Sequence, residues 1–157
     1  MKPKVYVETT IVSFVAARPS RNLVVMAHQK LTREWWRLRR TRFALYCSQL
    51  TVREAAAGDR RAAQRRMALI RDLPLLEIND FATRVARALL DEGAIPRKAA
   101  EDALHIVLAA AHGMEYLLTW NCKHIANAEM RAAVAAVCYA HACEPPVICT
   151  PEELMGL

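Results

Sequence analysis

Short strand-like segments alternate with longer helical patterns along this chain of 157 residues. Runs rich in β-branched and aromatic residues predict strands over residues 4–8, 42–50, 75–78, 115–120 and 147–149. Between them, helices are expected over residues 9–17, 23–40, 51–72, 80–93, 96–112 and 126–142. Alternation of this kind favours a parallel sheet with helices on both faces. The predicted fold class is therefore α/β, a central parallel sheet of four to five short strands in a single domain over residues 1–157.

Capping residues predict where several of these helices begin and end. Thr51 is expected to cap the helix over residues 51–72, and Glu54 three positions later would complete a capping box. The helices over residues 80–93 and 96–112 are expected to start and stop at Asp80, Gly93, Pro96 and Gly113.

The composition indicates a globular protein with no membrane partner. Hydrophobic residues make up 54% of the chain, yet no apolar run approaches the roughly 18 residues that a membrane span needs. Lysines precede the apolar N-terminal segment, as in a signal peptide, but Glu8, Thr9 and Thr10 interrupt it. We therefore expect a mature, cytoplasmic N-terminus. Five cysteines without a CxxC pair are typical of reduced, mostly buried thiols in that compartment.

The cysteines near the C-terminus leave one alternative open. Cys138, His141 and Cys143, with Cys122 and His124 upstream, would be the ligands of a zinc-stabilised interaction protein. The regular spacings of zinc fingers are absent, and a buried helix end explains the same residues.

Basic residues outnumber acidic ones and lie in two clusters. The 22 Lys and Arg against 16 Asp and Glu give a net charge of +6 and a pI near 9.3. Arginines concentrate in residues 37–42 and 60–66. Such clusters bind nucleic-acid phosphates or form solvated helix faces. The candidate RNA-binding residues are Arg60, Arg61, Arg65 and Arg66.

Acidic and amide side chains occur where the predicted strands end. Glu8 ends the first strand, Glu54 follows the second, Asn121 follows the strand over residues 115–120, and Asp102 lies on the helix that leads into it. Ligands of open α/β sheets bind beyond the carboxyl ends of the strands, so these residues are expected to share one rim. Each also has a structural explanation: a helix cap for Glu54, a turn for Glu8 and Asn121, and a salt bridge with arginine for Asp102.

Carboxylates gathered in this way predict a divalent cation. The carboxylates repel one another, and Mg²⁺ or Mn²⁺ relieves that repulsion while accepting oxygen ligands from substrate phosphates. Such an ion orients an attacking water and stabilises the departing oxygen of a phosphodiester. Because the chain is basic, metal-assisted hydrolysis of nucleic acid is the predicted chemistry.

Three segments resemble the PIN domain, the ribonuclease fold of the toxins in type II toxin–antitoxin systems. They are VYVETTIVS over residues 5–13, CSQLTVREA over residues 47–55 and EDALHIVLAAAHGMEYLLTWN over residues 101–121. The third is the most specific, since it is similar to the family's Asp-Ala-Leu on a buried helix followed by a strand that ends in Thr-x-Asp. The resemblance extends over essentially the whole chain.

The resemblance implies an endoribonuclease that uses Mg²⁺ or Mn²⁺, forms a homodimer and is silenced by a small antitoxin protein. Carried over by position, Glu8, Glu54 and Asp102 match metal-binding acids, and Asn121 stands where a fourth acid is usual. These four are the expected catalytic residues. The residues expected to support them are Thr10, Ser48, His105 and Thr119.

Two departures from the family pattern keep a second hypothesis open. Glu8 replaces the usual Asp and is one methylene longer, and Asn121 removes a formal charge. Three carboxylates can still hold one Mg²⁺. The alternative is a PIN-like RNA-binding module that keeps the fold but has lost catalysis.

Overall fold

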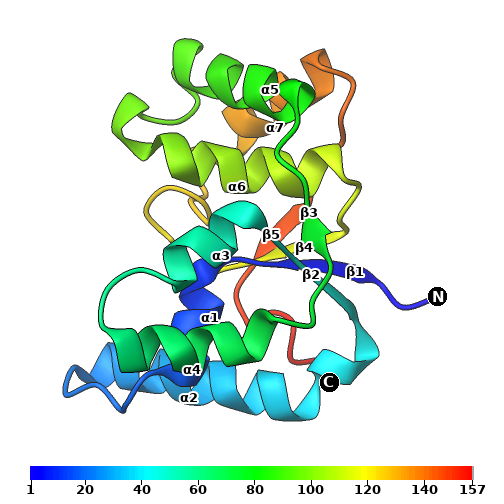
Figure 1. Ribbon diagram of the computed structural model, residues 1–157. Helices are drawn as coiled ribbons and strands as arrows, with labels where there is room; N and C mark the ends of the chain where they lie inside the picture. The colour runs from blue at the N-terminus through cyan, green and yellow to red at the C-terminus, as the bar shows by residue number, and fades with distance from the viewer. Residues whose placement is uncertain (157) are drawn as a thin grey trace.

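Five parallel strands form one sheet in the computed structural model, which describes residues 1–156 (Figure 1). The strands are β1 (Lys4–Val7), β2 (Ala44–Ser48), β3 (Leu75–Leu76), β4 (Tyr116–Leu118) and β5 (Val147–Cys149). Their order across the sheet is β3-β2-β1-β4-β5, and every neighbouring pair is parallel. The predicted α/β class with a parallel sheet is confirmed, and the arrangement is consistent with a PIN-like fold.

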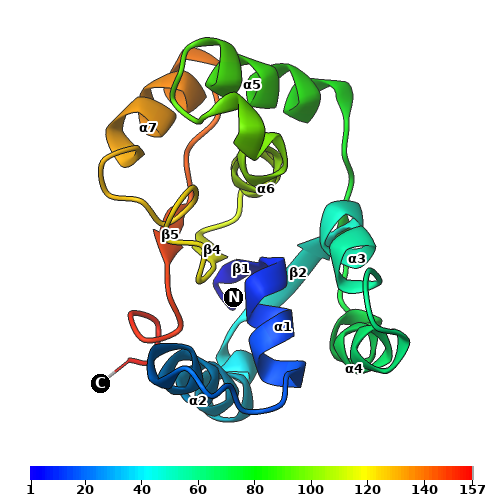
Figure 2. The ribbon, with the colours of Figure 1, turned by 90° about the vertical axis from the view of Figure 1, so that its left-hand side faces the viewer.

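Helices cover both faces of this sheet (Figure 2). One face packs against α5 (Asp80–Asp91), α6 (Ala100–Ala111) and α7 (Arg131–Ala140). The other packs against α1 (Thr9–Ala16), α2 (Leu23–Leu38) and α4 (Arg60–Ile70). The short helix α3 (Gln49–Ala55) follows β2 and contributes to both cores. Two single turns of 3-10 helix, η1 (Arg40–Arg42) and η2 (Arg97–Ala99), complete the elements.

The central strand β1 shows why both faces are apolar. Side chains alternate across a strand, so Tyr6 enters the core beneath α6 while Val5 and Val7 enter the opposite core. All three are fully buried, as expected for a parallel strand with helices on both sides.

The order of the strands places a topological switch point beside β1. The chain builds β2 and β3 on one side of β1 and then returns to build β4 and β5 on the other. The carboxyl ends of β1 and β4 therefore form the switch point at which open α/β sheets bind their ligands. Within residues 1–156, no helix combines the length and the apolar character that crossing a membrane demands.

The long helix predicted over residues 51–72 is wrong, because two helices occupy that segment. Ser48 caps α3, its side chain accepting from the Thr51 backbone N–H at 3.2 Å. Thr51 lies inside the helix, so the expected capping box with Glu54 does not form. The chain breaks at Gly58, whose φ of +81° lies in the left-handed region that favours glycine.

Other predicted helix boundaries shift by a few residues. Asn79, rather than Asp80, caps α5 by accepting from the Ala82 backbone N–H at 2.8 Å. Pro96 precedes η2 instead of starting α6, and the helix predicted from residue 126 begins at Arg131. The predicted glycine stops after α5 and α6 are confirmed, and both have positive φ: Gly93 and Gly113.

Candidate metal centre

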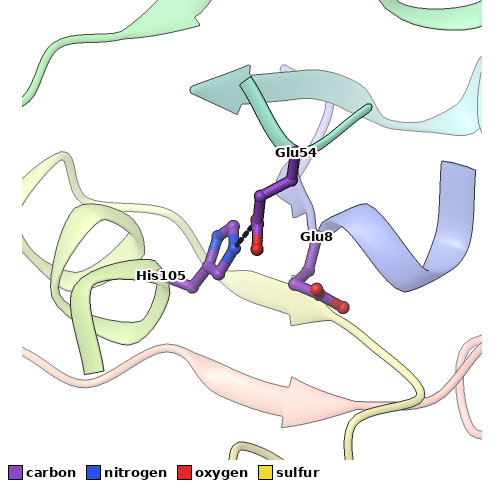
Figure 3. A group of neighbouring side chains, drawn as sticks. All are labelled: Glu8, Glu54 and His105. Atoms are coloured by element: carbon purple, nitrogen blue, oxygen red, sulfur yellow. Dashed lines mark hydrogen bonds and ion pairs between the residues drawn. The ribbon is translucent and has the colours of Figure 1, made fainter. Parts of the chain in front are cut away.

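Glu8, Glu54 and His105 converge at the carboxyl end of β1 (Figure 3). One possible ligand atom from each side chain lies within 4.8 Å of those of the other two. Glu8 directly follows β1, Glu54 lies in the second turn of α3, and His105 lies in the second turn of α6. No other group of three His, Cys, Asp or Glu side chains within residues 1–156 is this close.

Glu8 is buried, with 4% of its surface exposed, and its hydrogen bonds converge on Oε2. This oxygen accepts from the Thr10 backbone N–H at 3.1 Å, from the Thr10 hydroxyl, and from the Thr119 hydroxyl at 2.8 Å. The first bond makes Glu8 the N-cap of α1, and Thr119 directly follows β4. The helix N-terminus and these donors stabilise a buried carboxylate that pairs with no Lys or Arg within residues 1–156.

Glu54 is held by side chains from two other helices. Its Oε1 accepts from the Thr9 hydroxyl at 2.8 Å and lies 2.6 Å from Nε2 of His105. Burial by itself raises the pKa of Glu54, but the hydrogen bonds from His105 and the Thr9 hydroxyl hold that pKa below its ordinary value. The carboxylate is therefore ionised at neutral pH, and Nε2 of His105 carries the proton that it donates.

A buried chain of hydroxyl groups fixes the other side of the His105 ring. The Tyr6 hydroxyl lies 2.6 Å from Nδ1 of His105, 2.7 Å from the Ser48 hydroxyl and 3.2 Å from the Thr51 hydroxyl. In the neutral ring with its proton on Nε2, Nδ1 accepts from Tyr6, and the Ser48 and Thr51 hydroxyls donate to Tyr6. Burial raises the pKa of Tyr6 well above its ordinary value, which keeps the phenol protonated as a donor.

Asp102 lies in the first turn of α6 and forms a second polar group. Its Oδ1 accepts from Nδ2 of Asn121 at 3.0 Å, and its Oδ2 lies 3.1 Å from Nδ1 of His124. Oδ1 of Asn121 also accepts from the His124 backbone N–H at 3.0 Å. The Asn121 amide therefore binds Asp102 directly and also positions His124, the other partner of Asp102. The arginine pair considered for Asp102 belongs to the neighbouring Glu101, whose Oε1 lies 3.1 Å from Arg53.

Thr119 connects the two polar groups. The Asn121 backbone N–H donates to the Thr119 hydroxyl oxygen at 2.9 Å, and that hydroxyl donates to Glu8. Asp102 and Asn121 therefore lie at the same end of the sheet as Glu8. Asp102 is nevertheless outside the closest cluster. The position beside Glu8 and Glu54 that was predicted for Asp102 is occupied by His105, which was expected only as a supporting residue.

The acids of this region lack Lys and Arg partners. Within residues 1–156, no Lys or Arg forms an ion pair with Glu8, Glu54 or Asp102; the last two form ion pairs only with histidines. The chain nevertheless carries 22 Lys and Arg. The two carboxylates form a donor set that suits Mg²⁺ or Mn²⁺, with the His105 imidazole positioning Glu54. The residues present therefore fit a divalent cation.

The arginines predicted to contact RNA differ in their surroundings. Arg65 donates from Nε to the carbonyl of Ala16 at the end of α1, at 3.2 Å. Arg66 donates from Nε and from a terminal nitrogen to two carbonyls at the end of α3, the first at 2.8 Å. Arg60 and Arg61 are exposed on the first turn of α4. Arg65 and Arg66 thus support the ends of helices, whereas Arg60 and Arg61 project into solvent.

The C-terminal cysteines form no metal cluster within the described residues. The thiol of Cys143 donates to the carbonyl of Cys138 at 3.4 Å, and Nδ1 of His141 donates to the carbonyl of Val137 at 2.9 Å. Burial raises the pKa of Cys138 to about 12, which disfavours the thiolate that binds zinc. The structure therefore lends no support to the zinc alternative and favours the buried helix end.

Two residues of this site, Tyr6 and Thr9, were not assigned a role from the sequence, and His124 was considered there only as a zinc ligand. Strand alternation places Tyr6 opposite Val5 and Val7, but it does not show which helix the hydroxyl meets. Thr9 precedes Thr10 in the first turn of α1, and sequence alone does not distinguish which hydroxyl faces which acid.

Comparison with known proteins adds no relative: no protein-family model matches the chain, and no curated protein matches it.

Proposed function

We propose that this chain is a divalent-metal-dependent endoribonuclease with Glu8 and Glu54 as its principal metal ligands. The observation that carries the proposal is the convergence of these acids, unpaired with Lys or Arg within residues 1–156, at the carboxyl ends of central parallel strands. A cation at this point supplies the positive charge that the side chains do not.

Each residue has a distinct part in this proposal. Glu8 and Glu54 would hold Mg²⁺ or Mn²⁺, and His105 keeps Glu54 ionised and oriented through its Nε2–H. His105 would have to lose that proton to become a ligand itself, so we assign it a positioning role. When bound, the ion would lower the pKa of a water and stabilise the departing oxygen of a phosphodiester.

Asp102 is the third acid of the proposed site. Asn121 and His124 orient its carboxylate, and the link through Thr119 ties it to Glu8. Asn121 acts in this arrangement as a hydrogen-bond donor to Asp102 rather than as a weakened metal ligand.

The substrate and partners are proposed on two grounds. The net charge of +6 favours a polyanion, and the three PIN-like segments favour RNA over DNA. The same segments support a toxin that acts in the cytoplasm as a homodimer and is held by a small antitoxin protein. Five free cysteines agree with a reducing compartment.

A second candidate function is an RNA-binding module without catalysis. The observation that favours it is that the acids already have hydrogen-bond partners within the protein: Glu8 caps α1, and Asp102 is bound by Asn121 and His124. An acid in the place of Asn121 would leave Asp102 freer to meet a metal ion.

Cleavage of mixed-sequence RNA with Mg²⁺, Mn²⁺ or chelator tests the two candidates. The variants are Glu54→Gln and Asp102→Asn, and the matched control is Glu101→Gln, which alters the exposed acid next to Asp102. A metal-dependent nuclease cuts RNA only with added metal, loses roughly 100-fold or more in both variants and retains activity in the control. RNA binding without metal-dependent cleavage would identify the binding module.

A further inference from the structure

A cavity of about 290 Å³ lies between the C-terminal end of α1 and helix α4. Its lining includes Ser13 from α1, Arg18 just after α1, and Arg65 and Arg66 from α4. Figure 2 shows α1 and α4 on the face of the sheet opposite α5, α6 and α7. Of residues 1–156, three arginines and no acidic side chain line this cavity.

Two of these arginines are held in place by the backbone. Arg65 donates from Nε to the carbonyl of Ala16, and Arg66 donates from Nε and a terminal nitrogen to carbonyls at the end of α3. A guanidinium has five N–H groups, so each retains donors for a ligand. Anchored guanidinium groups lose little conformational entropy on binding, and their planar arrangement matches the oxygens of a phosphate.

The positive charge of the cavity is not neutralised by the protein. Within residues 1–156, Arg18, Arg65 and Arg66 form no ion pair with Asp or Glu. Asp59, the N-cap of α4, instead accepts a hydrogen bond from the Ala62 backbone N–H at 2.9 Å. Like charges that line one cavity repel one another, and an anion bound there would relieve the repulsion.

The cavity lies one helical turn from the candidate metal centre. Thr9, whose hydroxyl donates to Glu54, and Ser13, which lines the cavity, are four residues apart on the same face of α1. One turn of helix rises about 5.4 Å, so a single strand along this face can reach both sites.

We propose that this cavity is a backbone-phosphate subsite, in which Arg18, Arg65 and Arg66 hold a phosphodiester of single-stranded RNA a short distance from the one at the metal centre. The Ser13 hydroxyl is a further donor to the same phosphate. The identity of the polymer rests on the proposed function, whereas the anion site rests on the arginines. The contacts are to phosphate, so the subsite does not discriminate between base sequences.

Binding of a labelled, mixed-sequence single-stranded RNA in chelator, followed by fluorescence anisotropy over a series of salt concentrations, tests the subsite without cleavage. The test variant is Arg18→Gln with Arg65→Gln, and Arg66 is retained because it supports the end of α3. The matched control is Arg84→Gln with Arg87→Gln on α5, which removes the same charge from exposed residues on the other side of the sheet.

The test variant should lose about tenfold or more in affinity, and the slope of log K against log salt should fall by about 0.7, the value for one lost phosphate contact to a single strand. The control should change affinity less than twofold and keep the parent slope. Inorganic phosphate at matched ionic strength should compete with RNA for the parent and not for the test variant. Because Arg65 contacts the backbone, Arg18→Gln alone serves as a second variant and should lose about half of the slope change.

Equal losses in the test variant and the control, or no loss in either, would overturn the subsite. A separate cleavage assay with metal keeps the two proposals distinguishable. A parent that binds RNA through these arginines and does not cut retains the subsite and removes the nuclease. A parent that cuts RNA while the test variant binds normally removes the subsite alone.

Discussion

At the scale of single residues, Glu54 is the side chain that joins most elements of the candidate site. Its Oε1 accepts from Thr9 of α1 and from His105 of α6, while Glu54 itself belongs to α3. Without a capping box, Glu54 has no role at the start of its own helix. The residue therefore connects helices from both faces of the sheet.

Replacement of Glu54 by Gln should lower the free energy of unfolding at pH 7 by about 1 kcal/mol, because a charge-assisted hydrogen bond to His105 becomes a neutral one. The folded pKa of Glu54 is depressed, so its stabilising contribution is present above the ordinary value of 4.5 and is lost as the pH falls through the folded pKa. The difference between parent and variant should therefore shrink below pH 4.5. Urea unfolding at pH 7 and at steps down to about pH 3 measures this. A difference that stays constant with pH contradicts it.

Replacement of Asn121 by Asp tests the second polar group. Nδ2 of Asn121 donates to Asp102, and an aspartate there would remove the donor and bring two carboxylates together. In chelator we expect a loss of about 1–3 kcal/mol in the free energy of unfolding. Added Mn²⁺ should recover part of that loss, because a fourth carboxylate attracts the cation. Melting with and without chelator measures both effects, and unchanged stability in chelator would place Asn121 outside the site.

The sequence predicts which acids reach the rim, but not which side chains touch. Glu8 and Asn121 follow strands, so the order of elements is enough to place them at the carboxyl end of the sheet. Helix α6 is different, because it is buried almost all round from Ala103 to Ala110. Its sequence therefore has no polar face that would reveal its rotation. For this reason the sequence does not decide whether Asp102 or His105 meets Glu54.

At the scale of elements, the ends of α6 and α7 use the same hydrogen-bond pattern with different residues. After α6, the N–H groups of Gly113 and Met114 donate to Ala110 and Ala109 at 3.1 and 2.9 Å. After α7, those of Ala142 and Cys143 donate to Tyr139 and Cys138 at 3.1 and 3.0 Å in the same Schellman pattern. Gly113 has a φ of +64°, and Ala142 a φ of +56°. An alanine therefore occupies the position at which glycine is normally found.

Replacement of Ala142 by Gly should stabilise the protein by about 0.5–1 kcal/mol, since relief of the left-handed strain exceeds the entropy that glycine adds to the unfolded chain. The reverse comparison, Gly113→Ala, should destabilise the protein because it introduces that strain. Thermal or urea unfolding of the two variants measures the pair. If Ala142→Gly is destabilising, the C-terminal end of α7 does not adopt this conformation in solution.

The sequence contains a signal for the break between α3 and α4, but the helical composition around it favoured one continuous helix. Gly58 followed by Asp59 is a helix stop followed by a helix cap. Alanines on one side and arginines on the other continue a helical composition across it, and that composition led to one long helix. Local backbone geometry at a single glycine decided the outcome.

At the scale of the whole molecule, the two layers of helices control access to the thiols. Cys122 is exposed, whereas the other four cysteines are buried: Cys47, Cys138, Cys143 and Cys149. Burial raises the pKa of Cys47 to about 11 and that of Cys149 to about 12, which disfavours their reactive thiolates. An aromatic disulfide reagent at pH 8 should therefore modify one thiol quickly in the native protein and all five after denaturation. Rapid modification of more than one thiol in the native protein would show that a helix layer opens and exposes a buried cysteine.

Metal binding should stabilise the whole molecule, because its proposed ligands come from separate parts of the fold. Glu8 follows β1 and Glu54 lies on α3, with His105 of α6 behind it, so the unfolded chain cannot gather them. A ligand that binds only the native state at 100 times its Kd adds about 2.7 kcal/mol. For a domain of this size, that corresponds to a rise in Tm of roughly 5–11 °C. Thermal melting of the parent in Mn²⁺ against chelator measures the rise, which Glu54→Gln should reduce and Glu101→Gln should preserve. An equal rise in the parent and in Glu54→Gln would mean that Mn²⁺ binds elsewhere, and the carboxyl end of β1 would then no longer be the metal centre.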